Sequence, residues 1–305
     1  MSNHTEQINQ TSKAYTSLEL VKAAWKMTKL DKSIVVYPLL TSLGCLAVVV
    51  AISLVNAAMG GSVWWMFSFT QDLRYFALLA VEYLLTYLVV NYSNTALAVY
   101  AIDRLEGRTP SVSRSFRHAT RRIGAITLYT FIGSTVGMIF RVAERYLPIG
   151  PSLLAWLGEM GWAVATVFAV PILAAKEESP VQAIKESASI IKAKWGVAAL
   201  GDIFNITFLQ FALLAPLIII IPIIVIAPLS ITGQTYSSLL QYPVWALGLL
   251  LLSGLYAVAV IAITTVARRL FYTALYLHAT TGKQPAQYNE DLYAHAFKPK
   301  KDLFV

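Results

Sequence analysis

The chain has 305 residues, of which 57% are hydrophobic and only 13% are charged. Soluble domains carry roughly 25% charged residues, so this composition excludes an ordinary soluble fold and predicts an integral membrane protein. The net charge of +8 could indicate a nucleic-acid partner, but the basic residues lie in short segments beside apolar runs, where they orient spans and meet anionic headgroups. We therefore expect no nucleic acid as a partner.

The single cysteine, Cys45, excludes an intramolecular disulfide.

Six apolar segments are each long enough to cross a bilayer as a helix, which takes about 17–25 residues. The expected spans are residues 34–59, 73–101, 124–140, 153–175, 197–229 and 244–267. The predicted fold class is therefore all-α, a polytopic membrane protein with six transmembrane helices and further helices at the membrane surface. We expect residues 1–15 to be a disordered tail, residues 16–282 to form the membrane domain, and residues 283–305 to form a polar C-terminal tail. The first span is expected to be an uncleaved anchor, because its apolar run is too long for a signal peptide.

Residues 102–122 lie between the second and third spans and carry six arginines against two acids. Such dense positive charge between spans marks the cytoplasmic side of a membrane. With this segment inside, every Lys and Arg except Arg74, Arg141 and Arg145 falls on the cytoplasmic side. The sequence therefore predicts a cell-membrane protein with both termini in the cytoplasm.

Amphipathic helices are expected on the same side of the membrane, at residues 16–33, 109–123, 179–195 and 268–282. Two begin with start signals: Thr109 as N-cap before Pro110, and Ser179 as N-cap before Pro180. A basic face opposite an apolar face is typical of a helix that lies in the headgroup plane. Contacts with anionic lipid headgroups of the inner leaflet are therefore predicted for Arg114, Arg117, Arg121, Lys185 and Lys192.

The fifth span differs from the others because Pro216, Pro222 and Pro228 recur every six residues. Proline removes a backbone hydrogen bond inside a helix, so these residues predict a kinked or broken span. Broken helices near the middle of the membrane often mark substrate sites in transporters.

In the third span, Gly133 and Gly137 have the GxxxG spacing that permits close helix contact.

Two sets of polar residues lie inside the expected spans. In the outer third, Glu82 and Glu159 could form a proton- or cation-coupled site, or could pair with Arg141 or Arg145 at the same depth. The second set, in the inner half, comprises Asn91, Asn94, Asp202 and Asn205. This set could join helices by hydrogen bonds or line a polar cavity that opens to the cytoplasm.

Hydrolytic chemistry has little support in the sequence. None of the four histidines lies in a span, and the chain contains neither an HExxH zinc motif nor a glycine-rich phosphate loop. We expect no enzyme activity, no cofactor and no metal site.

Short motifs along nearly the whole chain resemble a prokaryotic membrane-protein family known only as a domain of unknown function. They are Trp25 with Leu30-Asp31-Lys32 and Tyr37-Pro38-Leu39; Asn94-Thr95-Ala96-Leu97; Gly107 with Pro110; Trp162, Thr166 and Val170-Pro171-Ile172-Leu173; Ser187 with Trp195-Gly196; and Ala274-Leu275-Tyr276 with Ala279-Thr280-Thr281-Gly282, Pro285 and Ala296-Phe297. The layout more loosely resembles the non-catalytic membrane domain attached to some glycerophosphodiester phosphodiesterases. Both resemblances imply a membrane fold, and neither transfers an active site.

Two functions are compatible with these patterns. The basic amphipathic helices favour a non-enzymatic membrane protein that organises lipids or a partner membrane protein. The proline-rich fifth span and the polar residues inside the spans favour instead a small-solute or ion- or proton-coupled transporter.

Overall fold

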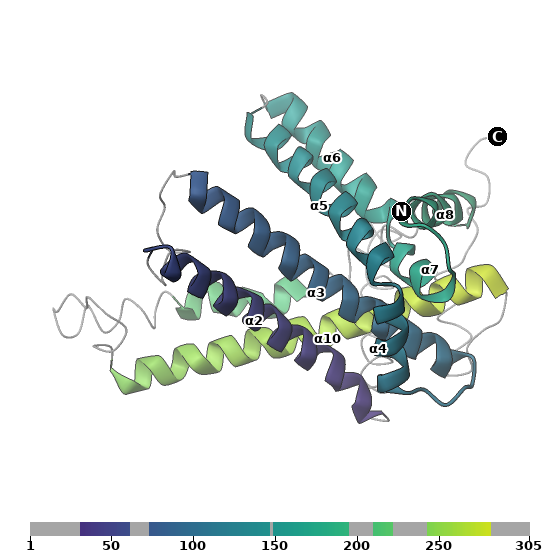
Figure 1. Cartoon of the computed structure of the whole chain (residues 1–305), viewed down its shortest axis with the longest axis horizontal. Helices are drawn as coiled ribbons and strands as arrows, with labels where there is room; N and C mark the ends of the chain where they lie inside the picture. The colour runs from purple at the N-terminus through teal and green to yellow at the C-terminus, as the bar shows by residue number, and fades with distance from the viewer. Residues whose placement is uncertain (1–30, 62–72, 147–148, 195–209, 222–242, 282–305) are drawn as a thin grey trace, which may run out of the picture. The chain divides into compact units, whose positions relative to one another are not determined.

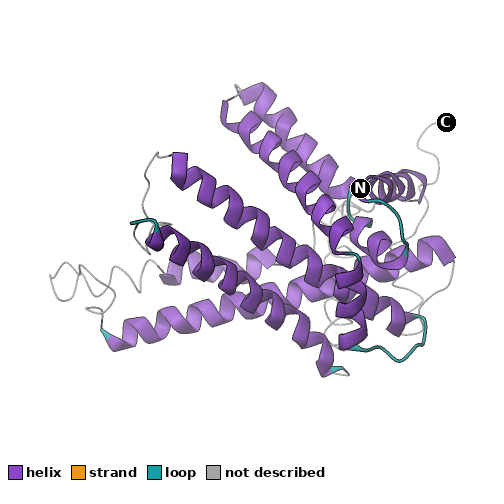
Figure 2. Cartoon of the chain, viewed as in Figure 1, coloured by secondary structure: helices purple, strands orange, loops and turns teal. Residues whose placement is uncertain are grey.

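The computed structural model describes residues 31–61, 73–146, 149–194, 210–221 and 243–281, and within them it contains helices and loops but no strand (Figure 2). Five helices in this part of the chain are long and apolar enough to cross a membrane: Lys32–Ala58, Leu73–Leu105, Ile123–Phe140, Trp156–Ala175 and Val244–Thr281. They confirm the prediction of an all-helical chain with several helices of membrane-spanning length. They correspond to the first, second, third, fourth and sixth expected spans.

Some predicted segments fall outside the described residues. These are the tails 1–15 and 283–305, nearly all of the amphipathic helix 16–33, and most of the fifth span.

The chain divides into two compact units. The larger unit comprises residues 26–200 and 269–305, and the smaller unit comprises residues 1–25 and 201–268. The last helix, α10 (Val244–Thr281), contributes residues to both.

The first span begins as a short 3-10 helix, η1 (Lys32–Val35), and continues as α2 (Val36–Ala58). Asp31 starts it as an N-cap, because its carboxylate accepts the backbone N–H of Ser33 at 3.1 Å. At the far end, Gly60 has a φ of +80°, a conformation that a residue with a side chain rarely adopts. The glycine therefore allows the chain to turn directly after the span.

The second span, α3 (Leu73–Leu105), is the central helix of the larger unit and contacts α2, α4, α5 and α7 (Figure 1). Its 33 residues would extend roughly 50 Å, more than a bilayer requires. All of its buried residues lie between Asn91 and Asp103. The tight packing of α3 is therefore confined to the half that leads into α4.

The helix α4 (Val112–Arg121) begins later than the sequence predicts. Thr109 and Pro110 were expected as N-cap and first helical residue, but the N-cap is Ser111, which has an extended backbone. The Thr109 carbonyl instead accepts a hydrogen bond from the Arg114 guanidinium at 2.5 Å. This contact helps to hold the residues before Ser111 in a loop.

The fourth span is not one continuous helix. The sequence predicts a single span over residues 153–175, whereas the structure has α6 (Ile149–Ala165) and α7 (Ala169–Ala175) separated by a three-residue turn. Pro171 explains the position of the turn, because it has no N–H for the carbonyl four residues earlier. Ser187 compensates from the neighbouring helix by accepting the buried N–H of Phe168 at 3.0 Å.

Two further helices complete the larger unit. The third span, α5 (Ile123–Tyr146), packs beside α6 (Figure 1). After α7, α8 (Pro180–Lys194) contacts α5, α6 and α7. It starts where the sequence predicts, and the Gln182 N–H donates to Ser179 Oγ at 3.3 Å, which confirms Ser179 as the N-cap.

In the smaller unit, a helix over Gln210–Ile221 is the described part of the expected fifth span. Two hydrogen bonds join it to α10: Tyr256 Oη donates to the Leu213 carbonyl at 2.8 Å, and Arg268 donates to the Gln210 side chain. These contacts occur within one compact unit and show that the two helices pack together.

The proline-rich region is only partly described. Pro216 lies inside the helix Gln210–Ile221, so the span is not broken at this proline, while Pro222 and Pro228 lie outside the described residues.

The sixth span does not end at residue 267, where the sequence predicts its end. It continues into the predicted amphipathic segment as the single helix α10, and Leu270 to Leu277 are all buried.

Candidate functional site

Asp31 joins η1 to the end of α3 that contains Tyr100 and Arg104. Its Oδ2 accepts hydrogen bonds from Tyr100 Oη and Arg104 Nη1, each at 2.5 Å. The side chains of Asp31 and Arg104 are 11% and 23% exposed. Burial acts to raise the pKa of Asp31, but hydrogen bonds from Tyr100 and Ser33 and the charge of Arg104 outweigh it and hold the pKa below its ordinary value of 3.8. Asp31 is therefore a charged carboxylate that fixes the start of the first span to α3.

Tyr37 connects the same region to α4. Its ring stacks on Phe116 with centroids 5.2 Å apart and meets Tyr100 edge-on at 5.6 Å. Its hydroxyl, which is buried, shares a 2.6 Å hydrogen bond with Ser115 Oγ. Aromatic contacts and hydrogen bonds thus hold α2, α3 and α4 together at one end of the larger unit.

Several arginines of residues 102–122 have partners within the chain. Besides Arg104, Arg108 contacts Asp103 at 2.9 Å and Glu106 at 2.5 Å. Arg114 Nε lies 3.9 Å from Asp103, and its other contact is the Thr109 carbonyl. The contacts of Arg108 and Arg114 lie at the segment that joins α3 to α4 and help to hold its conformation. Arg114, which the sequence predicts as a headgroup contact, is therefore less available for that role than its exposure suggests.

Arg117 and Arg121 differ from Arg104, Arg108 and Arg114. Both are exposed on α4, and neither forms a hydrogen bond or ion pair with a described residue. They are four residues apart and so share one face of the helix. Arg122 points elsewhere, since it donates to the Glu178 carbonyl at 2.6 Å. Of the six arginines, Arg117 and Arg121 are thus the two cations in the described structure that are free to meet an external anion.

On α8, Lys185 and Lys192 are also exposed and have no acidic partner among the described residues. A neighbouring lysine behaves differently: Lys176 Nζ lies 2.6 Å from Glu186 Oε1. Lys185 and Lys192 therefore remain predicted headgroup contacts.

The inner polar set is only partly described. The Asn91 amide donates to Thr130 Oγ1 of α5 at 3.1 Å, as expected for a hydrogen bond between spans. Asn94 is only 6% exposed, and its Nδ2 has no hydrogen-bond partner among the described residues. Asp202 and Asn205 lie outside the described residues, so whether they join the two asparagines stays a prediction.

Neither of the outer carboxylates, Glu82 and Glu159, forms an ion pair with a described residue. Glu82 Oε2 and, one turn later on α3, Thr86 Oγ1 are buried and have no hydrogen-bond partner within the described part of the chain. Glu82 lies seven residues before Val89, so the two residues are on the same face of α3. Val89 packs against Gly44 of α2. The side chains of Arg141 and Arg145, the predicted partners of the two carboxylates, are outside the described structure.

Sequence reasoning missed several residues that organise this region. Asp31 followed by Ser33 directly before an apolar run is an N-cap signal that could have been found. Tyr100, Thr130 and Ser187 carry no such local signal, because their partners lie on other helices. Among the described residues, no group of three or more His, Cys, Asp or Glu could hold a metal ion.

The comparison with known proteins gives one match. The family model DUF6159, a family of unknown function, matches residues 73–286, which is more than half of the chain. This confirms the resemblance to an uncharacterised family, while the similarity to the membrane domain of glycerophosphodiester phosphodiesterases is not shown. No curated protein and no solved structure matches the chain.

Proposed function

The chain belongs to the DUF6159 family, whose function is unknown, and from its residues we propose that it is a non-enzymatic integral membrane protein that gathers anionic lipids at the cytoplasmic membrane. In this proposal it has six spans, with the segment 102–122 and both termini in the cytoplasm. The positive-inside distribution of Lys and Arg supports this orientation. A partner membrane protein could be organised through the same lipids.

The free pair Arg117 and Arg121 is the observation that carries the proposal. Both extend from one face of α4, directly before the membrane-length helix α5 begins at Ile123. A Lys or Arg near an anionic leaflet contributes on the order of 1 kcal/mol, so the pair would favour an anionic lipid by roughly 30-fold over a neutral one. Because both side chains are exposed, salt should weaken the preference.

The test uses purified protein in nanodiscs that contain phosphatidylglycerol and phosphatidylcholine. The ratio of the two lipids retained on the protein is measured by native mass spectrometry. The double variant Arg117→Gln with Arg121→Gln should lose most of the enrichment in phosphatidylglycerol. Arg108→Gln, compared with the single variant Arg117→Gln, is the matched control, because each removes one positive charge and the Arg108 side chain is already paired within the chain.

A preserved enrichment in the double variant would contradict the proposal. So would a loss in the Arg108→Gln control equal to that in Arg117→Gln, since the effect would then follow net charge rather than the free face of α4. Size-exclusion chromatography of each variant establishes that the protein is folded.

Transport is the second candidate, and two observations favour it. The fourth span breaks at residues 166–168, and α7 beyond the break packs on α3. That helix carries the Asn94 amide, whose Nδ2 has no hydrogen-bond partner among the described residues. The buried oxygen of Glu82 adds an ionisable group inside a span. Proteoliposomes that contain a pH-sensitive dye would reveal proton movement under an imposed potential. Absence of flux, or equal flux in Glu82→Gln, would remove Glu82 as a coupling residue.

A further inference from the structure

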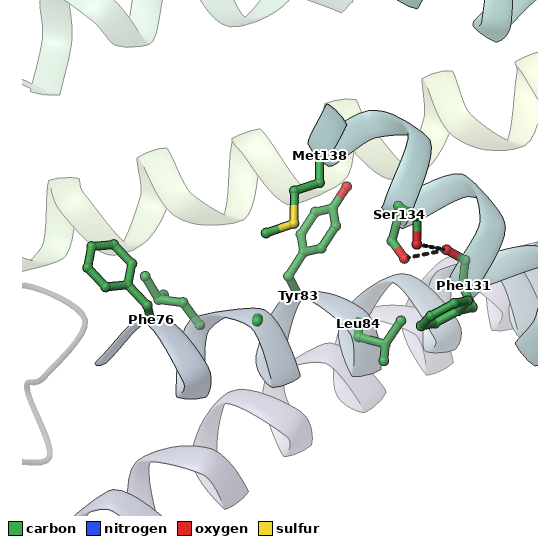
Figure 3. Close-up of a pocket in the computed structure, with 9 residues that line it drawn as sticks. Phe76, Tyr83, Leu84, Phe131, Ser134 and Met138 are labelled. Atoms are coloured by element: carbon green, nitrogen blue, oxygen red, sulfur yellow. Dashed lines mark hydrogen bonds between the residues drawn. The ribbon is translucent and has the colours of Figure 1, made fainter. Parts of the chain in front are cut away.

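A cavity of about 440 Å³ opens between α3 and α5 in the larger unit. Figure 3 shows side chains of both helices converging on it. Its walls include Phe76, Tyr83 and Leu84 of α3 and Phe131, Ser134 and Met138 of α5. The cavity lies toward the Leu73 end of α3, away from the buried half of that helix.

Two tyrosines and two glycines set the separation of the helices beside this cavity. A Cβ added to Gly133 would lie 3.3 Å from Tyr87 Oη, and one added to Gly137 would lie 4.0 Å from Tyr83 Oη. The two tyrosine rings stack with centroids 6.0 Å apart. Tyrosine side chains of α3, rather than its backbone, thus lie against the two glycines of α5. This arrangement leaves room between the helices for the cavity.

The chemistry of the walls favours an apolar occupant. The hydroxyls of Ser134 and Thr135 both donate to the Phe131 carbonyl, at 3.0 and 2.8 Å, and so have their donors occupied. Tyr83 contributes the one wall hydroxyl without a partner in the described residues. A ligand rich in polar groups would lose its hydration here without gaining hydrogen bonds in return.

The surroundings and the length of the cavity identify the kind of apolar molecule. Phe76, Phe131 and Met138 are 54%, 57% and 60% exposed on helices long enough to span a membrane, so their outer surfaces face hydrocarbon. From Phe76 to Leu84 the wall extends roughly 12 Å along the α3 axis. One leaflet contributes about 15 Å of hydrocarbon, half the thickness of the bilayer core.

We propose that this cavity is a binding groove for one acyl chain of a bilayer lipid, entering from the leaflet at the Leu73 end of α3. The free energy would come from packing against the aromatic walls, because a lipid chain is already in an apolar medium. The proposal does not depend on the basic face of α4, which concerns headgroups.

The test uses full-length protein in phosphatidylcholine nanodiscs with a small fraction of phosphatidylcholine that carries a photoreactive diazirine in one acyl chain. The neutral headgroup makes the result independent of the proposed preference for anionic lipid. After illumination, crosslinked residues are mapped by mass spectrometry. A diazirine near the carbonyl end should label the region of Phe76, and one near the methyl end should label the region of Leu84.

Substitutions that fill the groove should abolish its crosslinks. Met138→Trp and Ala80→Trp both place an indole in the wall, and two variants guard against one failing to fold. Ile139→Trp is the matched control, because Ile139 is the next residue and equally exposed at 60% but does not line the cavity. Loss of groove labelling in the first two variants, with labelling retained in the control, is the expected result.

Two other results would overturn the proposal. Labelling of equal strength over all exposed apolar residues of α3 and α5 would show an ordinary lipid annulus without a preferred site. Groove residues that stay unlabelled in the wild type, while other exposed residues react, would show that another segment of this chain or a second copy occupies the groove.

Discussion

The ion pair between Asp31 and Arg104 should stabilise the protein far more than an exposed pair does. Exposed pairs contribute about 0–1 kcal/mol, whereas breaking a fully buried pair costs about 3–5 kcal/mol. With side chains 11% and 23% exposed, this pair falls between the two limits. We expect Asp31→Asn to lower the free energy of unfolding by about 2 kcal/mol, the range for hydrogen bonds to a charged group. Asparagine still serves as an N-cap, so the loss reports the charge.

A double-mutant cycle measures this interaction. Asp31→Asn, Arg104→Gln and the double variant are unfolded by titration with SDS in detergent micelles, followed by circular dichroism. The coupling energy should be about 2 kcal/mol, so that the double variant is little worse than either single variant. Arg108→Gln is the control, since its side chain is 55% exposed and its loss should cost at most about 1 kcal/mol. A coupling below about 0.5 kcal/mol would refute the reasoning.

The same carboxylate predicts a dependence on pH. The pKa of Asp31 lies below 3.8 in the folded protein, so its contribution is present above the unfolded pKa of about 4 and is lost as the pH falls through the folded value. The difference in unfolding free energy between wild type and Asp31→Asn should therefore be full at about pH 6 and should shrink below about pH 4. A difference that stays constant down to about pH 3 would show that the charge does not stabilise the fold.

Further substitutions test the packing between helices, with unfolding in SDS as the measurement. Ser187→Ala removes the acceptor of a buried N–H at the start of α7 and should cost about 1–3 kcal/mol, whereas Ser189→Ala on the exposed face should stay within about 0.5 kcal/mol; equal effects would contradict the capping role. Gly44→Ala would place a Cβ 2.7 Å from Val89 Cγ1 and should cost about 1–3 kcal/mol, restored in part by Val89→Ala. Gly124→Ala meets open space and should instead stabilise α5 by roughly 0.5–1 kcal/mol.

The five described helices of membrane-spanning length could be predicted from sequence because a helix in lipid must be apolar over a fixed length. The start of α8 was predictable for a similar reason: Ser179 and Pro180 act within one turn, and nothing distant competes with them. At α4 the same local signal was misleading by two residues. There the Thr109 carbonyl is taken by an arginine side chain, an interaction that depends on how the loop folds back.

The availability of charges could not be predicted from sequence. Six arginines in one segment look equivalent along the chain, yet Arg104 pairs with Asp31, which is 73 residues away. Arg122 is likewise bonded to the distant Glu178 carbonyl. Only the folded arrangement separates these from Arg117 and Arg121. The break in the fourth span also depended on tertiary structure, since Ser187 supplies a partner for the interrupted backbone.

The uneven burial of α3 has a mechanical consequence. Its buried residues all lie between Asn91 and Asp103, and the contacts of Asp31, Tyr37 and Thr41 with neighbouring helices are at this same end. A lateral displacement there would break hydrogen bonds and ring contacts together. Near Leu73 little of α3 is buried, and there Arg74 holds it to the end of α2 by donating hydrogen bonds to Asn56 and Met59. The hydrogen bond between Asn91 of α3 and Thr130 of α5 lies at the buried end instead. Because that bond joins α5 to α3 at the buried end of α3, a change in bilayer thickness or lateral pressure would change the distance between these two helices most near Leu73.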